Sequence, residues 1–257
     1  MLLKFVQINI YKGKYLEALV DFLKKEDPDF ISVQELTYGV MNYFEDKKAD
    51  LFELLKSRLG LKGVSNFDWK VKDADTSLGN GVFSRYPIKD HHVLTLREAE
   101  PVKLAFAESE KGFPTAPRHL IVATCDFNGT DIRVMSWHAA WTAPPTDTEE
   151  TLRQAEMVRD YLVDLNKGKR PFLLGGDLNS TPDRRTIQMI SEVAINTMVN
   201  TSIVSTLHPK IHKISPKDLL VDYVFTSKHF ELKSIRVPEV TVSDHLPVVT
   251  VLEFKSS

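Results

Sequence analysis

The stretch Pro171–Pro182, Pro-Phe-Leu-Leu-Gly-Gly-Asp-Leu-Asn-Ser-Thr-Pro, indicates a buried strand that carries polar side chains to the edge of a sheet. Its apolar run, Phe172–Leu174, is bounded by turn-forming residues, which is typical of a strand covered on both faces. The Thr-Pro pair that closes the stretch predicts the N-cap and first turn of a helix. Asp177 and Asn179 therefore follow the carboxyl end of the strand, where ligands bind in α/β sheets. A simpler interpretation is that Asp and Asn only favour the turn.

The same arrangement recurs along the chain, because polar residues end or border apolar strands at six places. These are Asn9, Glu35, His138, Asp177, Asp222 and the pair Asp244-His245. If the strand ends meet at one edge, they form a pocket of carboxylates, imidazoles and amides. Clustered carboxylates repel one another, so a divalent cation is their natural neutraliser. Hard oxygen ligands favour Mg²⁺ or Mn²⁺ over zinc.

The apolar periodicity predicts strands and helices in both halves of the chain, without a linker between them. Strands are predicted over 3–8, 30–33, 69–71, 81–84, 92–96, 118–127, 132–137, 172–174, 220–226, 229–237 and 248–254, and helices over 14–26, 41–59, 148–166 and 186–193. Asn128-Gly129 predicts a tight hairpin turn. Residues 97–117 are expected to form a surface loop. This pattern suits two packed sheets in one domain that spans residues 1–257.

The composition is that of an ordinary globular protein of 257 residues, with a hydrophobic content of 42%. Its 33 Lys and Arg against 35 Asp and Glu leave a net charge of −2, so there is no overall basic field for nucleic acid. A local patch or a bound metal can still supply positive charge. Cys125 is the only cysteine, which rules out an intramolecular disulfide and a cysteine-based zinc site. The first ten residues resemble neither a signal peptide nor a membrane span. The protein is therefore expected in the cytoplasm, without membrane insertion.

Six motifs together resemble the endonuclease/exonuclease/phosphatase superfamily of deoxyribonuclease I-like metal-dependent phosphoesterases. They are Gln34-Glu35, the run from Gly79 to Pro87 (Gly-Asn-Gly-Val-Phe-Ser-Arg-Tyr-Pro), Trp137-His138-Ala139-Ala140, Gly176-Asp177-Leu178-Asn179, Val221-Asp222-Tyr223 and Ser243-Asp244-His245-Leu246-Pro247. The resemblance covers the whole chain. It implies an α/β (α+β) fold of four layers, an α/β/β/α sandwich of two packed mixed sheets with helices outside.

The resemblance also implies a metal site and an acid-base pair. Glu35 is the expected principal ligand for Mg²⁺ or Mn²⁺, with Asn9 and Asp244 assisting directly or through water. Asp222 is expected to orient His245 and raise its pKa, so that the imidazolium donates to phosphoryl oxygens in the transition state.

The remaining site residues are expected to handle the water and the substrate. Asp177 would orient or deprotonate the attacking water, and Asn179 would hold that water or a phosphoryl oxygen. His138 would protonate the leaving oxygen or bind a phosphoryl oxygen. Asn80 and Arg118 match positions that support this histidine or the phosphate. The six other histidines match no motif and are expected at the surface; they are His91, His92, His119, His208, His212 and His229.

The sequence favours a phosphodiesterase that acts on nucleic acid or a nucleotide-like diester. Residues 207–217 differ from the Trp-Pro-Gly-Asp-Arg-like run of inositol-polyphosphate 5-phosphatases, which counts against that activity. No long hydrophobic hairpin is visible, which counts against a sphingomyelinase. A phosphomonoesterase or lipid phosphoesterase using the same site is the first alternative. A catalytically silent binding module is the alternative from another class.

Overall fold

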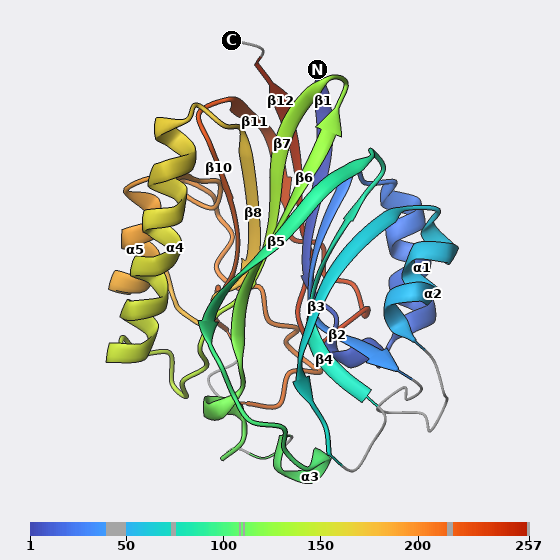
Figure 1. The fold of residues 1–257 in the computed structure, drawn as a ribbon, viewed down its shortest axis with the longest axis vertical. Helices are drawn as coiled ribbons and strands as arrows, with labels where there is room; N and C mark the ends of the chain where they lie inside the picture. Colours follow the sequence, from blue (N-terminus) through green and yellow to red (C-terminus); the bar gives the residue numbers. More distant parts are fainter. Residues whose placement is uncertain (40–49, 73–75, 108, 110, 215–217, 256–257) are drawn as a thin grey trace.

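The computed structural model describes residues 1–39, 50–72, 76–107, 109, 111–214 and 218–255. Two six-stranded mixed sheets pack face to face, with helices on both outer faces (Figure 1). The predicted four-layer α/β/β/α sandwich is therefore confirmed.

The first sheet contains strands from both ends of the chain, in the order β11-β12-β1-β2-β4-β3. Their bounds are β1 Leu2–Asn9, β2 Phe30–Gly39, β3 Lys62–Lys70, β4 Thr76–Ser84, β11 Phe230–Arg236 and β12 Val248–Phe254. β1 runs parallel to β2 and antiparallel to β12. The parallel pair places Asn9 beside Gln34, so both polar residues lie at the same end of the sheet.

The second sheet has the order β5-β6-β7-β8-β10-β9. Its strands are β5 Ile88–Arg97, β6 Arg118–Phe127, β7 Thr130–His138, β8 Phe172–Asp177, β9 Ile195–Asn196 and β10 Asp222–Thr226. β7 and β8 are parallel and pair His138 with Asp177, while antiparallel β10 pairs Asp222 with Asp177. Three of the predicted site residues thus form one row across the end of this sheet.

Helices α1 Leu16–Glu26 and α2 Leu51–Leu59 cover the first sheet, and α4 Glu149–Lys167 and α5 Arg185–Ser191 cover the second (Figure 1). Strand alternation explains the layers. Along β1, Phe5 belongs to the apolar cluster shared by the two sheets, whereas Val6 and Ile8 pack with the α1 cluster. None of the described helices has the length and apolar character needed to cross a membrane.

Two predicted strand ends lie inside longer strands. β2 continues beyond Glu35 because a bulge absorbs that residue: Val33 pairs with Gly81 and Leu36 with Gly79. Two residues of β2 thus oppose Asn80 alone. Gly79, Asn80 and Gly81 are turn-forming residues that precede and begin the strand predicted over 81–84, but they lie within β4, where Gly81 packs closely under Leu36.

The helix predicted over 186–193 is confirmed as α5, but its first turn begins at Arg185 and not at the Thr181-Pro182 pair. The Asp147 carboxylate accepts hydrogen bonds from the Arg185 and Thr186 amides, so a distant side chain caps the first turn. Within residues 97–117, the predicted loop also contains two short helices, α3 Leu104–Ala107 and η2 Phe113–Thr115.

Two other local predictions have definite outcomes. The Asn128-Gly129 turn is confirmed, because both residues have positive φ and join β6 directly to β7. The helix predicted over 41–59 is confirmed only as α2, which begins after its N-cap Asp50. Residues 41–49 lie outside the described part of the chain.

Candidate active site

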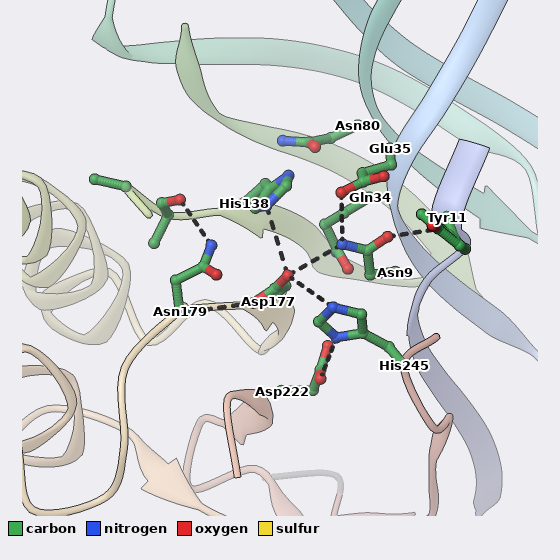
Figure 2. Close-up of polar contacts among 12 residues, drawn as sticks. Asn9, Tyr11, Gln34, Glu35, Asn80, His138, Asp177, Asn179, Asp222 and His245 are labelled. Carbon is green, nitrogen blue, oxygen red and sulfur yellow. Dashed lines mark hydrogen bonds and ion pairs between the residues drawn. The ribbon is translucent and has the colours of Figure 1, made fainter. Parts of the chain in front are cut away.

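Most of the predicted site residues lie together at the strand ends of the two sheets, as Figure 2 shows for Asn9, Glu35, Asn80, His138, Asp177, Asn179, Asp222 and His245. β1 and β2 bring Asn9 and Glu35 from the first sheet, and β7 and β8 bring His138 and Asp177 from the second. The Ser243 hydroxyl donates to the Asn9 carbonyl at 2.6 Å, which anchors the segment that carries Asp244 and His245. Residues separated by more than two hundred positions therefore share one centre.

Asp177 is the hub of this centre. Its Oδ2 accepts a hydrogen bond from Asn9 Nδ2 at 3.1 Å and lies 3.5 Å from His138 Nε2 and 3.7 Å from His245 Nε2 (Figure 2). Its Oδ1 accepts a hydrogen bond from the backbone N–H of Asn179 at 3.1 Å. Burial raises the pKa of Asp177 to about 6, and the charge of Asp222 adds to this effect although His245 opposes it. Asp177 is therefore an unusually basic carboxylate.

His245 and Asp222 form the pair expected from the sequence. His245 Nδ1 and Asp222 Oδ2 are 2.8 Å apart, and both side chains are buried. Burial alone would lower the pKa of His245, but the carboxylates of Asp222 and Asp177 outweigh it and raise this pKa well above its ordinary value. The imidazolium is thus the stable form at neutral pH, with Nε2 directed toward Asp177 (Figure 2).

His138 has the opposite protonation. Burial and the nearby Arg118 guanidinium lower its pKa well below the ordinary value. A neutral imidazole donates or accepts a hydrogen bond but is a poor source of a proton at neutral pH. Of the two predicted roles for His138, this protonation state favours binding of a phosphoryl oxygen.

Glu35 offers the ligand that a hard cation needs. Its Oε1 accepts from Asn9 Nδ2 at 3.2 Å, whereas its buried Oε2 accepts no hydrogen bond from any described residue. Lys12 Nζ lies 3.4 Å from this Oε2. Burial raises the pKa of Glu35, but the Lys12 ammonium is the largest of the effects that oppose it, and the net effect is a lowered pKa. An ionised carboxylate whose Oε2 accepts no hydrogen bond and is held only by the Lys12 ion pair fits Mg²⁺ or Mn²⁺.

Asn9 and Asp244, the other predicted ligands, have partners of their own. Asn9 Oδ1 accepts from the Tyr11 amide at 3.0 Å, which leaves one lone pair for a metal. Asp244 Oδ2 lies 3.2 Å from His212 Nδ1. Two groups have ligand atoms close enough to share an ion: His212, Asp244 and His245, and Asp177, Asp222 and His245. Neither group contains Glu35, so its pairing with Asp244 at a metal stays a prediction.

Asn179, Asn80 and Arg118 surround this centre. Asn179 Nδ2 donates to the Ala139 carbonyl at 3.2 Å, which leaves its second N–H for a ligand. Asn80 Nδ2 donates to the His119 carbonyl at 3.2 Å, so it supports β6 rather than His138 itself. Arg118 is buried, and burial lowers its pKa to about 10, at which the side chain remains a cation at neutral pH.

A cavity of about 310 Å³ opens over these groups. Asp177, Asn179 and His245 lie in its wall together with Arg118 and His138. It is large enough for a phosphoester with part of its organic substituent.

A family model described as the endonuclease/exonuclease/phosphatase family matches residues 6–245. The chain belongs to this family. Its members hydrolyse phosphoester bonds and are typically dependent on divalent metals. The residues that the resemblance singled out, from Asn9 to His245, all lie within the matched range.

Solved structures of the endonuclease/exonuclease/phosphatase family share the fold of this chain. A family protein from Bacteroides thetaiotaomicron has a TM-score of 0.75 at 17% identity, covering 100% of this chain and 99% of its own. A mannosyl-6-phosphatase from the same organism has a TM-score of 0.74 at 17% identity, with coverages of 98% and 100%. The human nocturnin catalytic domain with bound sulfate has a TM-score of 0.71 at 18% identity, with coverages of 99% and 94%. A search of curated protein sequences found no match.

Sequence reasoning missed three contributors to the site of this family member. Lys12 reaches Glu35 from a short 3₁₀ turn, η1 Tyr11–Gly13, in which Lys12 has φ 53°. Gln7 donates to both Gln34 and Asp222 between the sheets. The sequence indicated the role of Gln7 only through its position two residues before Asn9, since residues two apart lie on the same face of a strand.

The third is His212, which was expected at the surface but lies in the cavity wall beside Asp244. His212 is half-buried there, and His119, His208 and His229 are buried, so the surface prediction is wrong for these three and His212 lines the cavity instead of the open surface. It is confirmed for His91 and His92, which are exposed. Two of these histidines have side-chain partners from segments distant in sequence: Asp244 for His212 and Thr241 for His208.

Proposed function

We propose that the protein is a Mg²⁺- or Mn²⁺-dependent phosphodiesterase that acts on nucleic acid or a nucleotide-like diester. The observation that carries this proposal is the surroundings of Asp177. A buried carboxylate with a raised pKa lies at the base of a cavity and faces a neutral imidazole on one side and an imidazolium on the other.

Asp177 is the base that takes a proton from the attacking water. A pKa of about 6 leaves it ionised at neutral pH while making it a better proton acceptor than an ordinary aspartate. The backbone N–H of Asn179 holds Asp177 Oδ1, so Asp177 Oδ2 is the oxygen that faces the water. The free N–H of the Asn179 side chain would hold the same water or a phosphoryl oxygen.

His245 and His138 bind the phosphoryl group from different directions. The His245 imidazolium, held by Asp222, donates from Nε2 to an oxygen on which negative charge builds up in the transition state. Neutral His138 donates to a second oxygen, and Arg118 supplies a positive charge beside it. Phosphoryl transfer depends mainly on such positioning and charge neutralisation.

Glu35 would hold the metal, assisted by Asn9 Oδ1 and Asp244. When bound, the cation supplies Lewis-acid neutralisation of the phosphoryl oxygens, which the carboxylate-rich centre cannot provide by itself.

A substrate panel tests the proposal. Plasmid DNA, RNA, bis-p-nitrophenyl phosphate and inositol phosphates are each incubated with Mg²⁺, with Mn²⁺ and with EDTA. We expect hydrolysis of the diesters in either metal and none in EDTA. Preferential release of phosphate from inositol phosphates would establish the monoesterase instead, and hydrolysis of none of the substrates would favour the binding module.

A further inference from the structure

A second, smaller cavity adjoins the active site. This side cavity has a volume of about 70 Å³ and shares Glu35, Arg118 and His138 with the larger one. Lys12 and Phe113 also line both cavities, and the wall that belongs to the side cavity alone includes Asn66, Trp69, Leu78, Asn80, Ala116 and His119. A group bound here would therefore lie directly beside the phosphoryl position.

A bulge in β3 brings Asn66 and Trp69 into the wall of the side cavity. Asn66 pairs with Asn80 and Trp69 with Leu78, so two residues of β3 oppose the single residue Gly79 of β4. In a regular strand, residues three apart lie on opposite faces. The extra residue places Asn66 and Trp69 on the same face, beside Leu78 and Asn80, where all four line the cavity.

The side cavity collects hydrogen-bond donors that lack acceptors. Asn66 Nδ2, Trp69 Nε1 and Arg118 Nε are buried and have no hydrogen-bond partner among the described residues. The three residues are only 9%, 8% and 7% exposed. Eight buried side-chain atoms of the described chain are unpartnered in this way, and four of them belong to residues of this wall, the fourth being Glu35 Oε2. Since buried donors are rarely left unpaired, such clustering points to acceptors supplied by a ligand.

Part of the remaining surface of the side cavity is apolar, although Lys12, His119 and His138 also line it. Trp69, Leu78 and Ala116 form a small buried cluster of their own, separate from the two main cores. Phe113 closes the cavity from the η2 turn. Apolar walls around a few convergent donors suit a ring whose faces are apolar and whose rim carries oxygens.

We propose that the side cavity, which at about 70 Å³ is too small for a whole ring, takes the oxygen-bearing rim of a ring-shaped substituent of the phosphoester. Asn66 Nδ2 and Trp69 Nε1 donate hydrogen bonds to the rim oxygens. Arg118 Nε lies at the junction of the two cavities and binds an oxygen of the linking phosphate. Asn66 and Trp69 are thus specificity-determining residues. The inference rests on the proposed phosphoesterase function, because that function places the phosphate at the junction. A nucleobase with carbonyl oxygens and a sugar ring with hydroxyls share this chemistry.

Binding measurements distinguish the ring from the phosphate. Wild-type protein is titrated calorimetrically, in the presence of Mg²⁺, with thymidine 5′-monophosphate, mannose 6-phosphate and methyl phosphate. Phosphate release is followed in parallel so that no hydrolysed ligand is counted. We expect at least one of the ring phosphates to bind about tenfold or more tightly than methyl phosphate, and its identity assigns the ring.

Two variants test the named donors. Trp69→Phe removes Nε1 but keeps an aromatic ring, and Asn66→Ala removes the amide. Each should reduce the ratio of the affinity for the ring phosphate to the affinity for methyl phosphate by about five- to tenfold. The affinity for methyl phosphate itself should stay within about twofold of wild type. Trp137→Phe is the matched control, because Trp137 Nε1 is also buried and unpartnered but lies in the core, outside both cavity walls. This control should bind all three ligands as wild type does.

The outcomes separate the side cavity from the proposed function. Equal affinity for all three phosphates, or an unchanged ring advantage in both variants, overturns the side-cavity inference even if diesters are hydrolysed. Selective binding of a ring phosphate that depends on Trp69 and Asn66 supports it even if the substrate panel shows no turnover, in which case only the proposed hydrolysis fails.

Discussion

At the centre of the site, burial and neighbouring charges give adjacent side chains different protonation states. Asp177, His138 and His245 are neighbours, yet their pKa values shift in different directions. Burial raises the pKa of Asp177, and burial together with Arg118 lowers the pKa of His138. At His245 two carboxylates outweigh the effect of burial and raise the pKa. In the proposed mechanism, Asp177 is therefore the base, His138 a neutral hydrogen-bond donor and His245 a cation.

Replacing Asp177 should separate activity from stability. Asp177→Asn removes the base, so we expect turnover of bis-p-nitrophenyl phosphate to fall by about 10³-fold or more. A carboxyl whose pKa rises on folding favours the folded state below the unfolded pKa of 3.8 and loses that contribution as pH rises through about 6. At neutral pH the ionised group thus destabilises the fold, by at most about 3 kcal/mol.

Thermal unfolding in EDTA checks the second half of this prediction. Asp177→Asn should have a melting temperature at pH 7 no lower than that of wild type. Near-wild-type turnover would disprove the role of Asp177 as base, and a large drop in melting temperature would contradict its energetic role.

Asp222 should set the alkaline limit of activity. In wild type, we expect kcat/KM to rise as Asp177 loses its proton near pH 6 and to fall at high pH when His245 does so. Asp222→Asn removes the carboxylate that most strongly raises the pKa of His245. The descending limb should therefore move to lower pH, as measured by pH-rate profiles at constant Mg²⁺. An unchanged descending limb would show that another group controls it.

At the scale of single elements, bulges and glycines decide where the polar groups lie. Bulges in β2 and β3 both lie opposite the Gly79-Asn80 segment of β4 and place Glu35 and Trp69 in the two cavity walls. The glycines of β8 have a different role. A Cβ on Gly175 would lie 2.7 Å from Ser32 Cβ in the opposite sheet, so this strand allows the sheets to approach closely.

Gly175→Ala should therefore destabilise the protein. The methyl group would press on Ser32 and on the buried Gln7, and we expect a loss of about 1–3 kcal/mol in the free energy of unfolding. Gly168→Ala is the control, because its Cβ would meet only the flexible Arg170 side chain, at 3.1 Å. Chemical denaturation measures both variants. A Gly175→Ala protein as stable as the control would show that the sheets can separate at low cost.

The elements also show what sequence could and could not predict. Apolar periodicity located the strands that carry Asn9, His138 and Asp177, because regular burial leaves a regular pattern. It could not locate the bulge at Glu35, where tertiary pairing with β4 overrides the local turn signal of Gly79-Asn80-Gly81. The motifs identified the residues on which the proposed hydrolytic mechanism rests. The contacts of Lys12 and His212 depend on backbone turns and long-range packing that no local pattern records.

The whole molecule is held by one apolar cluster that both sheets share. Phe5, Phe30 and Val82 of the first sheet belong to the same cluster as Trp137 and Phe225 of the second. Neither sheet can expose its inner face without exposing that of the other. This shared core supports the prediction of a single domain over residues 1–257.

Unfolding should accordingly occur in one transition. Far-UV circular dichroism reports both sheets, whereas tryptophan fluorescence reports Trp69 in the first sheet, Trp137 in the second and Trp141, which follows β7. We expect the two signals to change together in urea, and Trp69→Phe and Trp137→Phe to give the same midpoint by both probes. Separate transitions would show that the sheets are independent units.

The meeting of distant segments at Asn9 has a consequence for how the protein is made. Ser243 donates to the Asn9 carbonyl, and β12 completes the sheet beside β1. During translation, Asn9, Glu35 and Asp177 leave the ribosome long before Asp244 and His245 do. The nascent chain therefore lacks an assembled centre, and the proposed hydrolytic activity begins only after the last strand has emerged.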